Sequence, residues 1–221
     1  MNEIDELTFR TRRREFEDGL FDLAMGLVFI AFSIPCAILF TDTGMYRLTA
    51  GLIFDRTGTL LLLLLVYLLM LVTPWLTRRA ITYLRRKFIW SDAGFTTPLP
   101  RAVSWKMTLL SALANVLVVI GGAAGWYGGL LTDEMALSLL PAAAGLSTVI
   151  LLLALASEMD LPRYRWVAVS GLILSILIPI LKVGNGTTWL IFGLGWMALL
   201  LVSGLSALIP VLKTRQEHAH G

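Results

Sequence analysis

The sequence has little charge and a single cysteine, and both shortages limit what the protein does. Charged residues make up 15% of the 221-residue chain, whereas a soluble domain typically carries about 25%. Because Cys36 is the only cysteine, an intrachain disulfide and a cysteine zinc site are both excluded. Cys36 lies in an apolar stretch, where we expect a buried and unreactive thiol.

Signatures of catalysis and cofactor binding are also missing. The chain contains no Walker A sequence, no His-Glu-x-x-His, no Gly-x-Ser-x-Gly and no metal-type spacing of cysteine and histidine. Six long apolar stretches have no ionisable residue in their interior, although such residues normally mark a proton or ion path in a membrane. These absences disfavour ion-coupled transport by the carboxylate route, and no cofactor is expected.

What the sequence does contain is a set of long apolar runs. The chain is 57% hydrophobic with a mean hydropathy of +0.79, and roughly 20 apolar residues suffice for a helix to cross a bilayer. The runs are continuous rather than alternating, which favours helices over a β-barrel. We therefore predict an all-α, polytopic transmembrane helical bundle that forms one integral membrane domain over 1–221. Its six spans are expected at about 21–40, 58–77, 107–127, 135–156, 165–182 and 187–212.

The basic residues are shared unequally between the two sides of the predicted bundle. Fifteen of the 18 Lys and Arg residues fall in the N-terminal segment 1–20, the connection 78–106, the connection around 163–165 and the tail 213–221. The positive-inside rule then places both termini in the cytoplasm. The expected location is the plasma (inner) membrane, crossed several times.

The first candidate site is a group of three acidic residues, Glu15, Asp18 and Asp22. On a continuous helix they fall at i, i+3 and i+7 and share one face, where carboxylates hold a divalent metal ion or act as acid and base. The structural interpretation is favoured over the metal site. Asp18 is suited to cap the first membrane helix, and Asp22 in its first turn is stabilised by the helix dipole.

The second candidate site is a group of five basic residues after the second span: Arg78, Arg79, Arg85, Arg86 and Lys87. Apolar residues recur beside them at helical spacing, and a basic amphipathic segment next to a span is typical of an interfacial helix on anionic headgroups. Alternation over 81–84 also permits a short strand, although a helix is favoured. We expect contacts with membrane lipids or with carboxylates of the same chain, and no nucleic acid.

The third group of candidates concerns helix packing. Gly121, Gly125 and Gly129 recur every fourth residue, a spacing that lets another helix approach closely. The partner helix belongs to the same chain or to a second copy in a homo-oligomer. Asn115 is expected to make an interhelical hydrogen bond, and Trp196 is expected to pack between helices.

Two stretches resemble segments of an uncharacterised family of prokaryotic multi-span membrane proteins. They are Glu15-Phe16-x-Asp18-Gly19-x2-Asp22 at the first span and Arg78-Arg79-x-Ile81-Thr82-Tyr83 after the second. The resemblance implies no known activity. It implies that these two segments act together.

The main functional hypothesis is a non-enzymatic scaffold or subunit that interacts with lipids or a protein partner. Its acidic N-terminal face docks on the basic segment 78–87 and forms a charged cytoplasmic collar. One alternative is a membrane-embedded, metal-dependent lipid-modifying enzyme that uses Glu15, Asp18 and Asp22. Another is a permease subunit that works with a separate ATPase.

Overall fold

The computed structural model describes residues 13, 16–85, 87, 105–181 and 183–219, and these ranges contain no strand. The all-α class is therefore confirmed for the described part of the chain. The helices, in chain order, are α2 (Leu20–Leu39), α3 (Asp42–Phe54), α4 (Arg56–Leu84), α5 (Trp105–Tyr127), α6 (Asp133–Glu158), α7 (Arg163–Ile180) and α8 (Asn185–Ala219).

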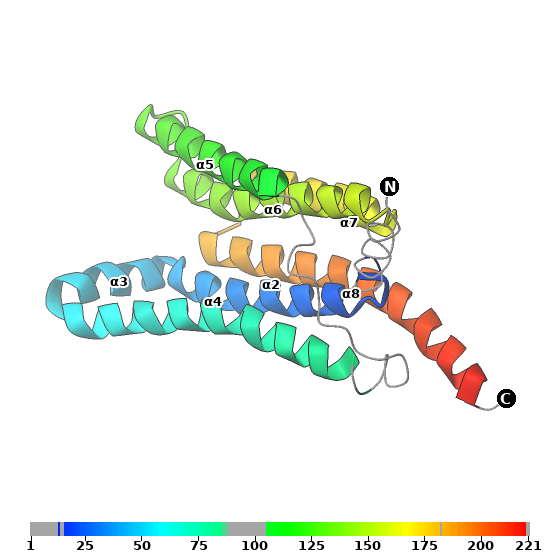
Figure 1. Cartoon of the computed structure of the whole chain (residues 1–221). Helices are drawn as coiled ribbons and strands as arrows, with labels where there is room; N and C mark the ends of the chain where they lie inside the picture. The colour runs from blue at the N-terminus through cyan, green and yellow to red at the C-terminus, as the bar shows by residue number, and fades with distance from the viewer. Residues whose placement is uncertain (1–12, 14–15, 86, 88–104, 182, 220–221) are drawn as a thin grey trace.

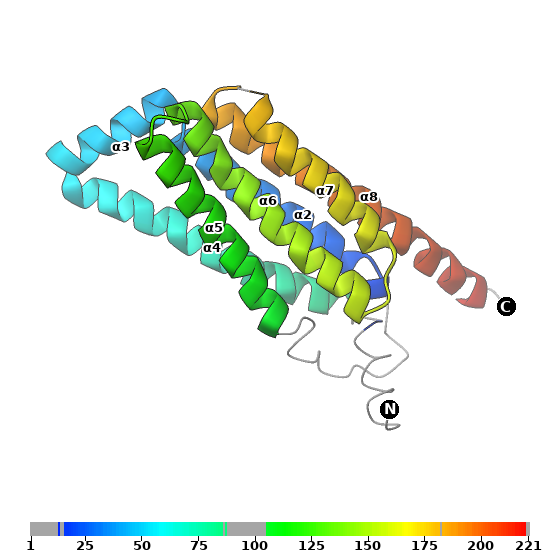
Figure 2. The same ribbon diagram turned by 90° about the horizontal axis from the view of Figure 1, so that it is seen from above.

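The helices form two layers that are visible in Figure 1. One layer contains α5, α6 and α7, and the other contains α2, α3, α4 and α8. The most extensive packing is between α2 and α8, although these helices lie at opposite ends of the chain. The layers meet where α7 and α6 contact α8, and the view in Figure 2 shows the C-terminal end of α8 projecting beyond the other helices.

Five of the described helices are long and apolar enough to cross a membrane, which fits a multi-pass membrane protein. They are α2, α5, α6 from Met135, α7, and α8 as far as Lys213. Their bounds agree to within a few residues with five of the six predicted spans. The remaining predicted span, 58–77, lies within α4, which is not among these five helices. Six spans therefore stay a prediction.

The connection between the first two predicted spans, 40–58, is largely helical because it contains α3. Thr41 has an extended backbone that ends α2, and its Oγ1 accepts a 3.0 Å hydrogen bond from the amide of Gly44. This side chain caps α3, as a threonine at the N-cap position commonly does. The helix α3 has only 13 residues, which is too few to cross the bilayer. A search of the sequence for membrane spans therefore does not detect it.

The helix α4 continues beyond its apolar stretch into the basic segment. Residues 78–84 belong to the same helix as the residues before them, which confirms the favoured helix over the alternative strand. At 1.5 Å per residue the 29 residues of α4 extend about 44 Å. The first part of the basic segment is therefore not a separate interfacial helix but the end of a long, continuous one.

Aromatic side chains fill the interface between α2 and α8. The indole of Trp196 is fully buried and stacks on Phe29, with ring centroids 5.2 Å apart and ring planes 12° from parallel. Further along, Trp189 stacks on Phe40 at 5.7 Å. Cys36 is buried in the same core. The predictions of a packing role for Trp196 and a buried thiol at Cys36 are thus confirmed.

Candidate functional site

The polar residues of α2 begin at a sharp turn before the helix. Gly19 has a left-handed backbone with φ of 72°, a conformation that glycine adopts without the steric cost of a side chain. The turn lies against α8 so closely that a Cβ added to Gly19 would overlap the carbonyl oxygen of Gly204. Glycine is thus required at Gly19 both by the backbone conformation and by the contact with α8.

Asp18 forms a buried ion pair with the end of α4. Its carboxylate accepts hydrogen bonds from Nε and Nη2 of Arg85 at 2.6 and 3.0 Å, and the two side chains are only 3% and 8% exposed. The same carboxylate accepts a 3.0 Å bond from the amide of Leu20 at the start of α2. Asp18 therefore satisfies a free amide of the helix and neutralises a buried guanidinium.

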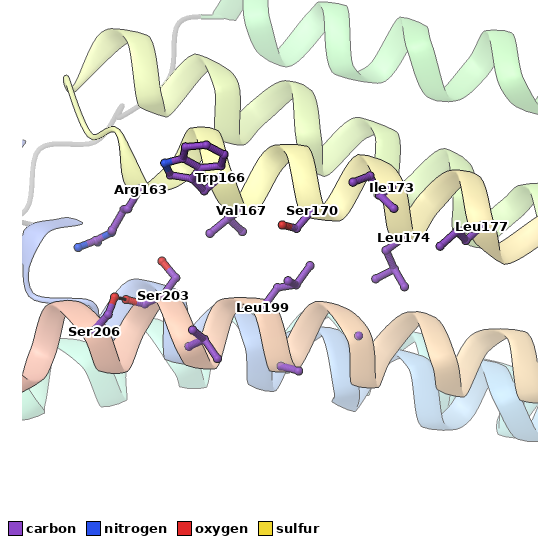
Figure 3. Close-up of a pocket in the computed structure, with 13 residues that line it drawn as sticks. Arg163, Trp166, Val167, Ser170, Ile173, Leu174, Leu177, Leu199, Ser203 and Ser206 are labelled. Atoms are coloured by element: carbon purple, nitrogen blue, oxygen red, sulfur yellow. Dashed lines mark hydrogen bonds between the residues drawn. The ribbon is translucent and has the colours of Figure 1, made fainter.

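Asp22 lies in the first turn of α2 and is completely buried. The hydroxyl of Tyr164 donates to one carboxylate oxygen at 2.5 Å, and the hydroxyl of Ser203 donates to the other at 2.7 Å. The Nε of Arg163 lies 3.4 Å from the second oxygen, within ion-pair distance. Asp22 thus joins α2 to α7 and α8, and Figure 3 shows Arg163 and Ser203 at the same end of the space between α7 and α8.

Arg163 also fixes the segment that precedes α2. Its guanidinium donates to the carbonyl oxygens of Phe16 and Glu17, the latter at 3.2 Å. Arg13 adds a second connection nearby, because it donates to Glu17 at 2.7 Å and lies 3.5 Å from Asp160 in the turn between α6 and α7. These contacts attach the N-terminal segment to the start of α7.

We call Asp18, Arg85, Asp22, Tyr164, Ser203 and Arg163 together the polar cluster. The continuous helix assumed for the three acidic residues does not exist, because α2 begins at Leu20 and the chain turns at Gly19. Asp18 and Asp22 consequently face different partners, and Glu15 lies outside the described residues. Among the residues that are described, no three His, Cys, Asp or Glu side chains are arranged to hold a metal ion.

The other basic candidates have different environments from Arg85. Arg78, Arg79 and Lys87 are exposed on α4 and the turn that follows it. The guanidinium of Arg79 lies 4.0 Å from the ring centroid of Trp75, at cation–π distance. Nζ of Lys87 donates to the hydroxyl of Tyr83 at 3.4 Å. Arg86 lies outside the described residues.

The packing candidates on α5 are only partly placed against other helices. A Cβ at Gly121 or Gly129 would meet no described atom within 4 Å, whereas one at Gly125 would meet Leu131 just beyond the end of α5. The buried glycine that faces α6 is Gly122, where a Cβ would meet Leu139. The Gly121 face of α5 therefore points away from the described helices.

A serine, and not the predicted asparagine, makes the hydrogen bond between α5 and α6. The hydroxyls of Ser111 and Ser147 are 2.6 Å apart. Asn115, one turn further along α5, is half-buried and makes no side-chain hydrogen bond to any described residue. The interhelical bond expected at Asn115 thus occurs one helical turn earlier.

Sequence reasoning missed three members of the polar cluster: Arg163, Tyr164 and Ser203. Tyr164 and Ser203 are 142 and 181 residues away from Asp22, so no local spacing connects them. One signal was available, because the Asp22 carboxylate at the mouth of a membrane span needs buried partners from other helices.

The fold and the polar cluster fit an all-α, multi-pass membrane protein. In it, the buried carboxylates of Asp18 and Asp22 connect the start of α2 to α4, α7 and α8. No family model, curated protein or solved structure matches the chain.

Proposed function

We propose that the chain is a non-enzymatic membrane scaffold that binds anionic lipid headgroups at the end of α4. The observation that carries the proposal is that, at this end of the bundle, some charged residues are paired within the protein and others are exposed. The buried Asp18 and Asp22 carboxylates are engaged by partners of the same chain, whereas Arg78 and Arg79 stay exposed. The Asp18–Arg85 pair would then connect the first segment of the family resemblance to a residue two positions beyond the second segment.

The exposed part of α4 has the composition of a headgroup site. A surface hollow of about 550 Å³ is lined by Trp75, Arg78, Arg79, Thr82 and Tyr83. Tryptophan and tyrosine prefer the headgroup level of a bilayer, and arginine pairs well with phosphate. In the proposed topology of six spans with cytoplasmic termini, α4 crosses the membrane and presents these residues to the anionic lipids of the cytoplasmic leaflet.

The metal-dependent lipid-modifying enzyme is the weaker proposal. It needs Glu15, Asp18 and Asp22 to converge on one ion, but the carboxylates of Asp18 and Asp22 point to Arg85 and to Tyr164 with Ser203. A scaffold or a permease subunit requires no such convergence. Co-purification of an ATPase with the intact protein would distinguish the permease subunit from the lipid-binding scaffold.

The lipid-binding proposal is tested by the thermal stabilisation that added phosphatidylglycerol gives to the detergent-purified protein. Each basic residue near an anionic surface contributes about 1 kcal/mol, so Arg78→Gln with Arg79→Gln should weaken binding roughly 30-fold. High salt should weaken binding in the same way. The matched control is Arg47→Gln, which removes an exposed cation on α3. Equal stabilisation of the wild type and the double variant would contradict the proposal.

A further inference from the structure

An elongated groove of about 620 Å³ runs between α7 and α8 (Figure 3). It opens toward the outside of the bundle, because rim residues such as Trp166, Ile173 and Val202 are 75%, 54% and 67% exposed. Its lining on α8 includes the small residues Gly195 and Ala198. In a membrane protein, an opening of this kind faces the lipid.

The two ends of the groove differ in polarity. Arg163, Ser203 and Ser206 lie together at one end, with Ser170 next along α7, and the opposite end is lined by Leu174, Leu177 and other apolar groups (Figure 3). The polar end includes two members of the polar cluster, Arg163 and Ser203, and lies at the same end of the bundle as Asp18 and Arg85. The groove is therefore polar at one end and apolar at the other, as a lipid with a polar headgroup and an apolar chain is.

The length of the groove matches one leaflet of a bilayer. Its lining on α7 extends from Arg163 to Leu177, which is about 21 Å at 1.5 Å per residue. Half of a bilayer, including its headgroup region, is about 20–22 Å thick. A molecule that fills the groove from end to end thus has the length of one membrane lipid.

The polar end offers one charged hydrogen-bond donor to the oxygen atoms of a lipid. The Arg163 side chain is 22% exposed, and its hydrogen bonds within the described residues use Nη1 once and Nη2 twice. A second Nη1 proton is left, since each Nη of a guanidinium carries two. The hydroxyls at the same end are already engaged, because Ser203 donates to Asp22 and Ser206 donates to the carbonyl oxygen of Ser203, each at 2.7 Å. A phosphate oxygen is the acceptor that fits the remaining charged donor.

We propose that this groove holds one glycerophospholipid, with its phosphate at Arg163 and one acyl chain along α7 and α8. The site is separate from the headgroup surface on α4, since the two share no residue. The lipid site between α7 and α8 does not depend on the proposed function, and each of the two proposals is tested with its own variants.

The proposal is tested by filling the groove and counting retained lipid by native mass spectrometry of the intact, purified protein titrated with phosphatidylglycerol. Ala198→Trp places a large side chain in the groove, and Leu201→Trp is the matched control on an exposed position of the same helix outside the lining. We expect the wild type and Leu201→Trp to retain one tightly held phospholipid, and Ala198→Trp to bind it at least tenfold more weakly. Equal retention by the two tryptophan variants would overturn the proposal.

Further arms separate the lipid from other occupants. Arg163→Gln should weaken phosphatidylglycerol binding roughly tenfold, since a hydrogen bond from a charged donor is lost, but should leave the binding of diacylglycerol, which has no phosphate, unchanged. If Ala198→Trp does not fold, Val202→Trp fills the same groove from another exposed position. A wild type that is dimeric and becomes monomeric on filling of the groove would show that a second copy occupies it, which also overturns the proposal.

Discussion

The guanidinium of Arg85 lies 2.6 Å from the carboxylate of Asp18, across 67 residues of the chain. This contact joins the end of α4 to the turn before α2, and both side chains are buried. It matters for the architecture because α4 packs only on α2 and α3 to any large extent among the described helices. The ion pair is thus one of few connections that hold the end of α4 in place.

The Asp18–Arg85 pair should show strong energetic coupling. Removing one member of a buried pair leaves an uncompensated charge, at a cost of about 3–5 kcal/mol, whereas removing both costs less. Asp18→Asn and Arg85→Met should each lower the free energy of unfolding by several kcal/mol, and the double variant should lose less than their sum. Unfolding of the four proteins in detergent measures the coupling energy. Additive losses would mean that the two side chains do not stabilise each other.

The Asp22 interactions should also be separable by mutation. Asp22→Asn leaves Arg163 without its buried counter-charge and should cost about 3 kcal/mol, or roughly 6–12 °C in melting temperature for a chain of this size. Tyr164→Phe removes one hydrogen bond to the carboxylate and should cost about 1.5 kcal/mol. The melting temperatures of the purified variants provide the measurement. A Tyr164→Phe variant with a lower melting temperature than the Asp22→Asn variant would contradict this account.

Gly19→Ala should be strongly destabilising despite the small change in volume. An alanine at φ of 72° is strained, and its Cβ would overlap the carbonyl oxygen of Gly204 in α8. We expect a loss above about 2 kcal/mol, because backbone strain and overpacking add. Gly184→Ala is the control, since a Cβ there meets no described atom within 4 Å. Similar melting temperatures for both variants would rule out the tight approach of the Gly19 turn to α8.

The glycines of α5 should separate packing within the chain from packing between copies. Gly122→Leu places bulk against Leu139 and should cost about 1–3 kcal/mol. Gly121→Leu points away from the described helices and should change stability by less than about 0.5 kcal/mol. If the Gly121 face forms a homo-oligomer, Gly121→Leu should reduce the oligomer fraction measured by mass photometry. A stability loss at Gly121 as large as that at Gly122 would contradict this assignment of the two faces.

Much of the fold could be predicted from the sequence, because the membrane imposes one simple requirement. A helix that crosses lipid needs a long apolar run, and such runs mark α2, α5, α6, α7 and the part of α8 up to Lys213 within a few residues of their bounds. The helix α3 does not meet this requirement, since it is short and begins at a threonine cap. A search of the sequence for membrane spans therefore does not detect α3, although Thr41 is a residue type that commonly caps helices.

The site was less predictable, because its contacts depend on where the backbone turns. Placing Asp18 and Asp22 on one helical face assumed an unbroken helix, and a single left-handed residue, Gly19, directs the two side chains to different partners. Their partners come from α4, α7 and α8, which no local pattern connects to α2. Spacing along the chain could identify the acidic residues but not their environments.

The contacts of Asp22 have a consequence for how the protein is made. Asp22 belongs to α2, which precedes the other described helices along the chain, while Tyr164 and Ser203 follow 142 and 181 residues later. At about 5–20 residues per second, Tyr164 is synthesised roughly 7–28 s after Asp22. Until then the carboxylate has none of the partners that surround it in the finished structure. The contacts that hold Asp22 of α2 are therefore complete only after α8 is synthesised, and a chain that ends before α8 lacks the Ser203 contact.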